Sequence, residues 1–227
     1  RHWVFPDASL FARDEFPDPE GYRSVFQTHF QDKSNPAVVR YPLDDLAAFP
    51  ERQMRTDTHY SHIGNTCLAA DLLGIDDFSY VPSQIAAGRQ EEYIGDLGVQ
   101  CTPSIGEVTT RLPLSKGLAL VSNGLRAGNN GIIELLTSPN ALTSRKLLLM
   151  GDSFYRSLAP FLARYYASIV FVRTPFFHED LALAAAPDDI LTGNAERYLR
   201  AVTLDATAPH FLAFPLIAGV PQNPDPG

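Results

Sequence analysis

Residues 146–154 read KLLLMGDSF, and this stretch decides the fold class. Its first five residues are a short, largely apolar run, which is typical of a strand buried on both faces of a parallel sheet. A glycine and an aspartate follow, then Ser153, and apolar residues recur at helical spacing from Leu158 to Tyr165. The stretch therefore predicts a strand, a tight turn and a helix, with Ser153 at the carboxyl end of the strand.

The alternation of strands and helices continues towards the C-terminus. The patterns predict strands at 168–172 and 189–192 and helices at 179–186 and 195–201. Strands that alternate with helices favour right-handed crossovers and a parallel sheet. The fold class is therefore expected to be α/β.

The sequence before residue 146 is less regular. We expect an irregular or β-rich insertion at about 75–140, in which the apolar runs 118–121 and 132–136 predict a hairpin. The insertion would pack on a single domain that spans residues 1–227, with a Pro-rich tail at about 209–227.

Composition excludes some function classes. The chain has 227 residues, of which 45% are hydrophobic, and its net charge is -8, which argues against a nucleic-acid partner. No run approaches the roughly 20 apolar residues of a transmembrane helix. The sequence shows no initiator Met and no leader-like segment, so we expect a mature or excised domain. Cys67 and Cys101 lack zinc-site spacing and are either two buried free thiols or one disulfide formed in an oxidising compartment.

Ser153 is a candidate nucleophile. Ligands of α/β sheets gather at the carboxyl ends of the strands, and the amides that open the following helix can stabilise a negative charge. The alternative is a serine that caps the helix.

His59 is a candidate base, because Asp57 lies two residues before it and can orient the imidazole. Both precede a helix that the apolar spacing predicts from about 62 to 73. The alternative is a surface turn in which Asp57 caps that helix. A metal site of Asp57, His59, His62 and Asp152 is a further alternative, although the usual helical zinc spacing is missing.

The order of several short motifs resembles that of the SGNH-hydrolase-like O-acetyltransferases, which include the alginate O-acetylation proteins of the bacterial periplasm. In that family Asp-x-His comes before the serine, which permutes the order of ordinary SGNH enzymes. The motifs are RTDTHY at 55–60 with Gly64, GDSF at 151–154, VFPD at 4–7, GDLG at 95–98, PDDI at 187–190 and ERYL at 196–199.

The resemblance implies an SGNH-hydrolase-like three-layer α/β/α sandwich. It also implies that Ser153 is the nucleophile, His59 the base and Asp57 its orienting residue. The expected activity is transfer of an acetyl group through an acyl-serine to a hydroxyl of a polysaccharide or oligosaccharide. A membrane-bound acyltransferase would supply the acetyl group, and the location would be periplasmic or otherwise extracytoplasmic.

Two other functions stay open, an acetylesterase and an inactive carbohydrate-binding module. No glycine loop that cradles a nucleotide is present, so we expect no cofactor.

Further residues are expected near this site. Asn194 follows a strand and is a candidate oxyanion donor, with a helix cap as its alternative. Tyr155 and Arg156 follow the nucleophile and could orient an acyl or sugar group. Tyr60, Phe154 and Tyr155 could stack on a sugar ring, and core packing is the alternative for all three, expected more for Phe154 than for the two tyrosines. We interpret Glu196 and Arg197 as an internal ion pair.

Overall fold

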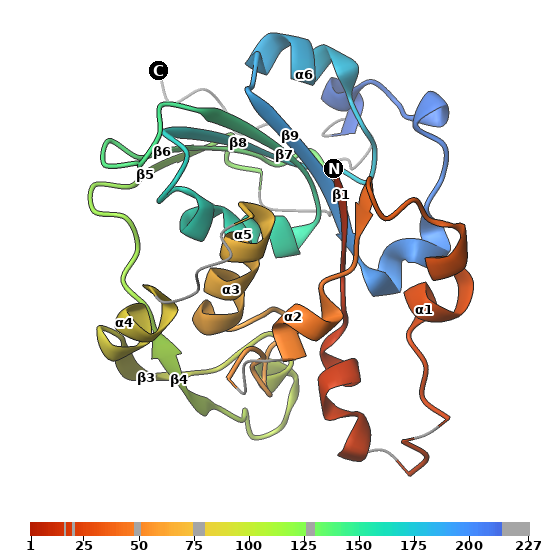
Figure 1. Ribbon diagram of the computed structural model, residues 1–227, viewed down its shortest axis with the longest axis vertical. Coiled ribbons are helices and arrows are strands. Elements are labelled where there is room, and N and C mark those ends of the chain that lie inside the picture. The colour runs from red at the N-terminus through yellow and green to blue at the C-terminus, as the bar shows by residue number, and fades with distance from the viewer. Residues whose placement is uncertain (16, 20, 48–50, 75–79, 126–129, 215–227) are drawn as a thin grey trace. The chain divides into compact units, whose positions relative to one another are not determined.

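The computed structural model describes residues 1–15, 17–19, 21–47, 51–74, 80–125 and 130–214. The chain divides into two compact units. The first unit comprises residues 1–3, 115–194 and 198–227, and the second comprises 4–114 and 195–197. Figure 1 labels the elements in chain order.

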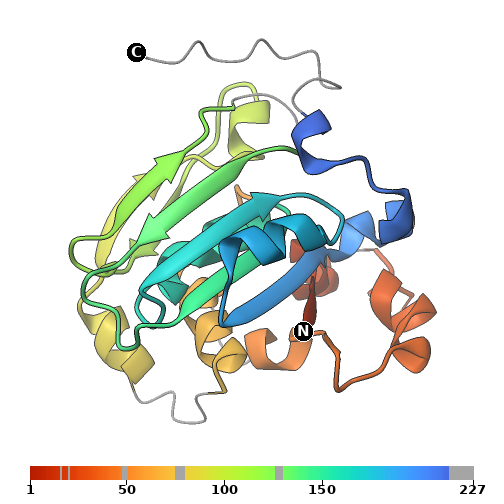
Figure 2. The same ribbon diagram turned by 90° about the horizontal axis from the view of Figure 1, so that it is seen from above.

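The first unit is built on a mixed sheet. Its strands hydrogen-bond in the order β9-β7-β8-β6-β5. Strand β7 pairs parallel with β8 and β9, whereas β6 pairs antiparallel with β8 and β5 (Figure 2). The strands are β5 (Ala119–Ser122), β6 (Ile133–Thr137), β7 (Lys146–Gly151), β8 (Ser168–Arg173) and β9 (Asp189–Ala195).

Helices cover both faces of this sheet. Helix α5 (Ser153–Leu162) lies on one face and α6 (Glu179–Ala185) on the other (Figures 1 and 2). Residues 147–150 of β7 are at most 1% exposed, as expected of a strand between two helical layers. The predicted α/β fold class and its α/β/α layering are therefore confirmed.

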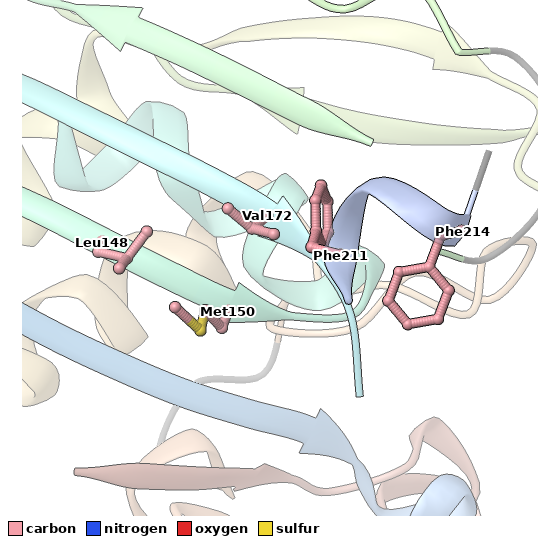
Figure 3. Packing of buried hydrophobic residues seen from close by; sticks show 5 residues of the cluster. All are labelled: Leu148, Met150, Val172, Phe211 and Phe214. Carbon is pink, nitrogen blue, oxygen red and sulfur yellow. The ribbon is translucent and has the colours of Figure 1, made fainter. Parts of the chain in front are cut away.

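A hydrophobic cluster covers the sheet on the face that carries α6. Phe211 and Phe214 pack with Leu148, Met150 and Val172, as Figure 3 shows. Leu181, Ala182 and Ala185 of α6 pack against the same cluster. The beginning of the predicted Pro-rich tail is thus part of the core of this unit, and residues 215–227 lie outside the described part.

The second unit is mainly helical. Its helix α3 contributes Ile63 and Cys67 to a buried cluster with Val81 and Leu112. Strands β3 and β4 pair as an antiparallel hairpin, and β1 (His2–Phe5) begins in the first unit and continues into this one. The other elements are η1 (Ala8–Glu15), α1 (Val25–His29), η2 (Gln31–Lys33), β2 (Val39–Arg40), α2 (Leu43–Ala47), α3 (His62–Leu72), α4 (Tyr80–Ala86), β3 (Arg89–Tyr93), η3 (Gly98–Gln100) and β4 (Glu107–Arg111).

Most of the predicted elements exist, with three corrections. The hairpin predicted from the runs 118–121 and 132–136 is the β5–β6 pair, and it extends the main sheet in antiparallel direction. Strand β9 runs on to Ala195, where the prediction ended at Thr192. The predicted helix at 195–201 is the 3₁₀ helix η4 (Glu196–Ala201), and two more 3₁₀ turns follow, η5 (Asp205–Thr207) and η6 (Phe211–Ala213). The single domain with one insertion stays a prediction.

Two further expectations concern membrane spans and cysteines. Within the described ranges, no helix is both long enough and apolar enough to cross a bilayer. Cys67 is buried and Cys101 is exposed, and both are free thiols, so the disulfide alternative is wrong. Burial raises the pKa of the Cys67 thiol to about 12, which makes it unreactive at neutral pH.

Candidate active site

Ser153 is the first residue of α5, directly after the turn that ends β7. The helix cap is the preceding residue, Asp152, whose Oδ1 accepts a hydrogen bond of 2.9 Å from the amide of Phe154. The alternative in which Ser153 is the cap is therefore wrong. Ser153 lies in the first turn of a ten-residue helix, where the partial positive charge of the helix N-terminus favours a developing anion.

The turn before Ser153 needs a glycine. A Cβ atom at Gly151 would lie 2.2 Å from the carbonyl oxygen of Gly193 and 2.7 Å from the ring of Tyr155. Tyr155 is fully buried, and its hydroxyl donates to the carbonyl oxygen of Thr192 at 2.9 Å. Tyr155 therefore packs between the sheet and α5. Its hydroxyl is used inside the core, and its expected role in orienting substrate stays a prediction.

A pocket opens at the carboxyl ends of β7, β8 and β9. We call it the first pocket; its volume is about 190 Å³. Its walls include Gly151, Asp152, Arg173, Thr174 and Asn194. Asn194 is 7% exposed and lies within β9, so it is part of a strand rather than a helix cap. The position expected for the oxyanion donor is thus a wall of a pocket next to the start of α5.

Asp57 and His59 form a direct pair in the second unit. Asp57 Oδ1 lies 2.7 Å from His59 Nδ1 and also accepts the backbone amide of His59 at 2.8 Å. The side chain of Asp57 is 5% exposed and that of His59 is 22% exposed. A carboxylate accepts hydrogen bonds only, so Nδ1 carries the proton and the lone pair of the neutral ring lies on Nε2. This is the tautomer that a general base requires.

Other groups hold Asp57 in its charged form. Its Oδ2 accepts the hydroxyl of Tyr93 at 2.7 Å and the amide of Asp96 at 3.4 Å. Burial by itself would raise the pKa of Asp57, but hydrogen bonds from the side chain and backbone of His59 and from Tyr93 outweigh it and lower the pKa to about 2. Burial and the same contact raise the pKa of Tyr93 to about 12. Asp57 is therefore ionised at neutral pH.

Side chains from distant positions fix the loop around this pair. The carboxylate of Glu107 on β4 accepts the amide and the hydroxyl of Thr56, each at 2.7 Å, and the amide of Arg55 at 3.0 Å. The carboxylate of Asp96 accepts the amide of Thr58 at 2.8 Å and its hydroxyl at 2.5 Å. We call Glu107 and Asp96 the two carboxylate anchors of the loop.

The GDLG motif at 95–98 packs against the same loop. A Cβ atom at Gly95 would lie 2.2 Å from the carbonyl oxygen of Thr56 and 2.5 Å from Cβ of Asp57. The amides of Leu97 and Gly98 both donate to that carbonyl at 2.9 Å. The sequence motif was part of the family resemblance, and the structure gives it a physical role as the support of the Asp57 backbone.

Two other residues expected to contact substrate have partners within the protein. Tyr60 is 3% exposed, and its hydroxyl donates to the carbonyl oxygen of Pro6 at 2.6 Å. Arg156 forms an ion pair of 2.5 Å with Glu134, a residue of β6 that is 4% exposed. These contacts give the Tyr60 hydroxyl and the Arg156 guanidinium internal partners, and the expected roles of both residues at a sugar or acyl group stay predictions. Phe154 is 2% exposed, as expected of core packing.

Glu196 and Arg197 do not pair with each other, which corrects the expected internal ion pair. Arg197 contacts Asp7 at 2.5 Å. Glu196 accepts the amide of Phe26 and the hydroxyl of Tyr41. Both residues hold the N-terminal segment of the second unit.

The four-residue metal set considered above is not assembled. His62 Nδ1 accepts the amide of Leu112, and its Nε2 contacts Arg111. The ligand atoms of Asp57, His59 and Asp96 lie within 4.8 Å of one another. The contacts already given use these atoms, because Nδ1 of His59 meets Asp57 and both Asp96 oxygens accept from Thr58. The geometry is that of a hydrogen-bonded pair with its supports.

The comparisons with known proteins agree with this fold. No protein-family model and no curated protein matches the sequence. Among solved structures, a DHHW family protein from Eubacterium siraeum superposes with a TM-score of 0.61 at 14% identity, covering 89% of this chain and 78% of that one. Bacillus cereus PatB1, solved with a sulfonyl adduct, gives 0.60 at 10% identity, covering 87% and 82%.

The O-acetyltransferase domain of Pseudomonas putida AlgJ gives a TM-score of 0.50 at 15% identity, covering 92% of this chain and 78% of that domain. The chain shares the fold of these proteins. The expected resemblance to O-acetyltransferases of this kind is thus confirmed for the fold, and these low identities carry no residue roles.

Sequence reasoning missed Tyr93, Glu107 and Asp96 as supports of the pair. Only Asp96 had a signal, since it lies in the quoted GDLG motif. Tyr93 and Glu107 face the loop because the β3–β4 hairpin places them there, and Tyr93 is paired with Glu107 in the hairpin register.

Proposed function

We propose that this chain is an O-acetyltransferase in which Ser153, His59 and Asp57 act as nucleophile, base and orienting residue. The observation that carries the proposal is the Asp57–His59 pair. In this pair the Asp57 carboxylate is held ionised, and Nε2 of His59 is the basic atom. The position of Ser153 after β7 and the fold shared with an O-acetyltransferase domain support it.

The reaction would proceed in two steps. His59 Nε2 takes the hydroxyl proton as Ser153 Oγ attacks the acetyl carbonyl carbon, and the imidazolium then protonates the departing alcohol of the donor. In the second step His59 takes the proton of a sugar hydroxyl, whose oxygen attacks the carbonyl carbon of the acetyl-serine. The bond between that carbon and Ser153 Oγ breaks, and the imidazolium returns the proton to Oγ. The amides at the start of α5 and the side chain of Asn194 would stabilise the oxyanion in both steps.

The acceptor in this proposal is a polysaccharide or oligosaccharide. A membrane-bound acyltransferase would supply the acetyl group, and the location would be extracytoplasmic. The second candidate is an acetylesterase, in which water takes the place of the sugar. The side chain of His59 is partly exposed, so water can reach its imidazole. This exposure favours the acetylesterase as the second candidate.

Labelling with a serine-directed fluorophosphonate tests the nucleophile. We expect a single adduct that maps to Ser153 by peptide mass spectrometry. The PatB1 structure with a sulfonyl adduct supports a second probe, a sulfonyl fluoride. The Asp57→Asn variant should label much more slowly, whereas Asp189→Asn, which alters an exposed ion pair with Arg145, should label at the original rate. A folded chain whose Ser153 stays unlabelled would remove the proposed nucleophile.

A product measurement separates transfer from hydrolysis. The chain is incubated with an activated acetyl ester and a panel of oligosaccharides, and acetylated sugar and free acetate are quantified by mass spectrometry. Oriented binding of a sugar hydroxyl lowers the barrier by roughly 7 to 11 kcal/mol relative to a random encounter, so a sugar that fits should compete with water. Free acetate as the sole product across the whole panel would establish the esterase.

A further inference from the structure

A second pocket adjoins the first one within the same unit. Its volume is about 140 Å³, and it lies at the carboxyl ends of β7 and β9. Thr174, Pro175, Asn194 and Val202 line both pockets. Asn194 is therefore a common wall between the pocket next to the start of α5 and this second pocket.

The second pocket combines an aromatic surface with polar groups. Phe176 and Phe177 line it, and Phe177 is 39% exposed. The polar wall includes His2, Thr192 and Asp205. An exposed aromatic ring beside hydrogen-bonding side chains suits a ligand that has both an apolar face and hydroxyl groups at its edge.

The contacts of the polar wall fix its orientation. His2 Nδ1 lies 2.8 Å from the hydroxyl of Thr192, which holds the imidazole against β9. Asp205 Oδ1 accepts the backbone amide of Phe177 at 2.9 Å, so the carboxylate is held next to the residue that carries the aromatic ring. A carboxylate has two oxygens that each accept hydrogen bonds, and the amide of Phe177 uses only one of these positions on Asp205. A ligand hydroxyl can donate to one of the others.

The charge of the wall selects the kind of sugar. Asp205 is an exposed carboxylate. Burial, and after it the positive charge of the N-terminal amine, lowers the pKa of His2 below its ordinary value, so the imidazole is neutral at pH 7. A carboxylate next to a neutral imidazole repels an anionic ligand and accepts hydrogen bonds from hydroxyl groups.

We propose that the second pocket is an acceptor subsite that binds one neutral sugar ring, with the ring stacked on Phe177 and its hydroxyls bound by Asp205 and His2. Only the role of the bound sugar as an acceptor rests on the proposed function. Sugar binding in the pocket is inferred from the pocket's own residues. The side chain of Asn194 would then lie between the sugar ring in the second pocket and an acyl group in the first pocket.

Binding measured without catalysis tests the subsite. The Ser153→Ala chain is titrated by calorimetry with neutral oligosaccharides and with acidic oligosaccharides of the same length. We expect the neutral sugars to bind more tightly. Phe177→Ala and Asp205→Asn in this background should each weaken that binding about tenfold or more, which corresponds to a loss near 1.4 kcal/mol. Phe177→Tyr, which keeps the ring, should retain it.

Phe30→Ala is the matched control, because Phe30 lies in the other unit and is 37% exposed, much as Phe177 is. It should leave sugar binding unchanged. Circular dichroism checks that each variant is folded, and Asp205→Asn provides a second route if Phe177→Ala does not fold. Tighter binding of acidic sugars, no binding of any sugar, or binding that ignores both substitutions would overturn the subsite.

The fluorophosphonate experiment keeps this inference separate from the proposed function. Labelling of Ser153 without sugar binding would reject the subsite alone. Sugar binding that depends on Phe177, in a chain whose Ser153 does not label, would reject the catalytic proposal and keep the subsite.

Discussion

The molecule holds its candidate catalytic residues in two different ways. Regular backbone structure positions Ser153, because the buried strand, the turn and the capped helix that hold it are all within a few residues of it in sequence. Asp57 and His59 lie in a loop whose shape depends on side chains such as Tyr93, Asp96 and Glu107. The first arrangement is local in sequence, and the second needs contacts across 36 to 51 positions.

This difference predicts how each region responds to substitution. Around Ser153, single changes of surface side chains should leave the geometry intact, because strand pairing and helix packing maintain it. Around His59, single changes of anchoring side chains should move the base without unfolding the chain. The predictions below use this contrast, beginning with the largest effect.

Ser153→Ala should abolish turnover of an activated acetyl ester while the fold is kept. The loss should be about 10⁴-fold or more, as for nucleophiles of other serine enzymes. Turnover is measured with a chromogenic acetate, and circular dichroism and the melting temperature report the fold. Full activity in the folded variant would refute the assignment of Ser153.

Asp57→Asn should reduce the rate by up to roughly 10⁴-fold, because an amide can hold His59 in the wrong tautomer. The measurement is the same ester assay, repeated after treatment with a chelator. A triad is indifferent to the chelator. Activity that a chelator removes and a divalent ion restores would instead point to a metal at Asp57, His59 and Asp96.

The sequence predicts the first region well and the second only in part. Strand β7, helix α5 and the position of Ser153 follow from periodicity between 146 and 165, because the physical causes of strand and helix formation are local there. The adjacency of Asp57 and His59 also follows from their spacing. In contrast, the burial of Tyr60 and Tyr155 depends on which face of the fold receives each side chain. The 3₁₀ form of η4 likewise depends on tertiary contacts, since Glu196 accepts the amide of Phe26, a residue 170 positions away.

Glu107→Gln should lower activity by about 10- to 100-fold with little loss of stability, since a displacement of about 1 Å at a catalytic group costs on that order. Both oxygens of Glu107 accept backbone amides, so the new NH₂ group must face a donor and push the loop away. The control is Glu91→Gln on the partner strand, where the carboxylate pairs with Arg111 at the surface. We expect kcat to fall in Glu107→Gln and to stay within twofold in Glu91→Gln. Equal effects of the two substitutions would show that the anchors do not position the base.

The smallest effect concerns the stability of the region that holds the base, and it comes from His62 at the start of α3. Burial, together with the positive charge of Arg111, lowers the pKa of His62 from 6.5 to about 4. The unfolded chain therefore binds a proton at His62 as the pH falls below 6.5, whereas the folded chain does so only near pH 4. It follows that the contribution of His62 to stability is complete above pH 6.5 and is lost as the pH falls towards 4.

His62→Gln removes this titration, because glutamine carries no charge at any of these pH values. Thermal or urea unfolding measured between pH 7.5 and 4.5 should therefore show a shallower loss of stability in the variant than in the original chain. The comparison of slopes cancels the titration of other histidines, including His178, whose pKa is also lowered by burial. Parallel curves for the two chains would mean that His62 is protonated equally in the folded and unfolded states, and that Arg111 and the burial of the ring do not act on it as the contacts indicate.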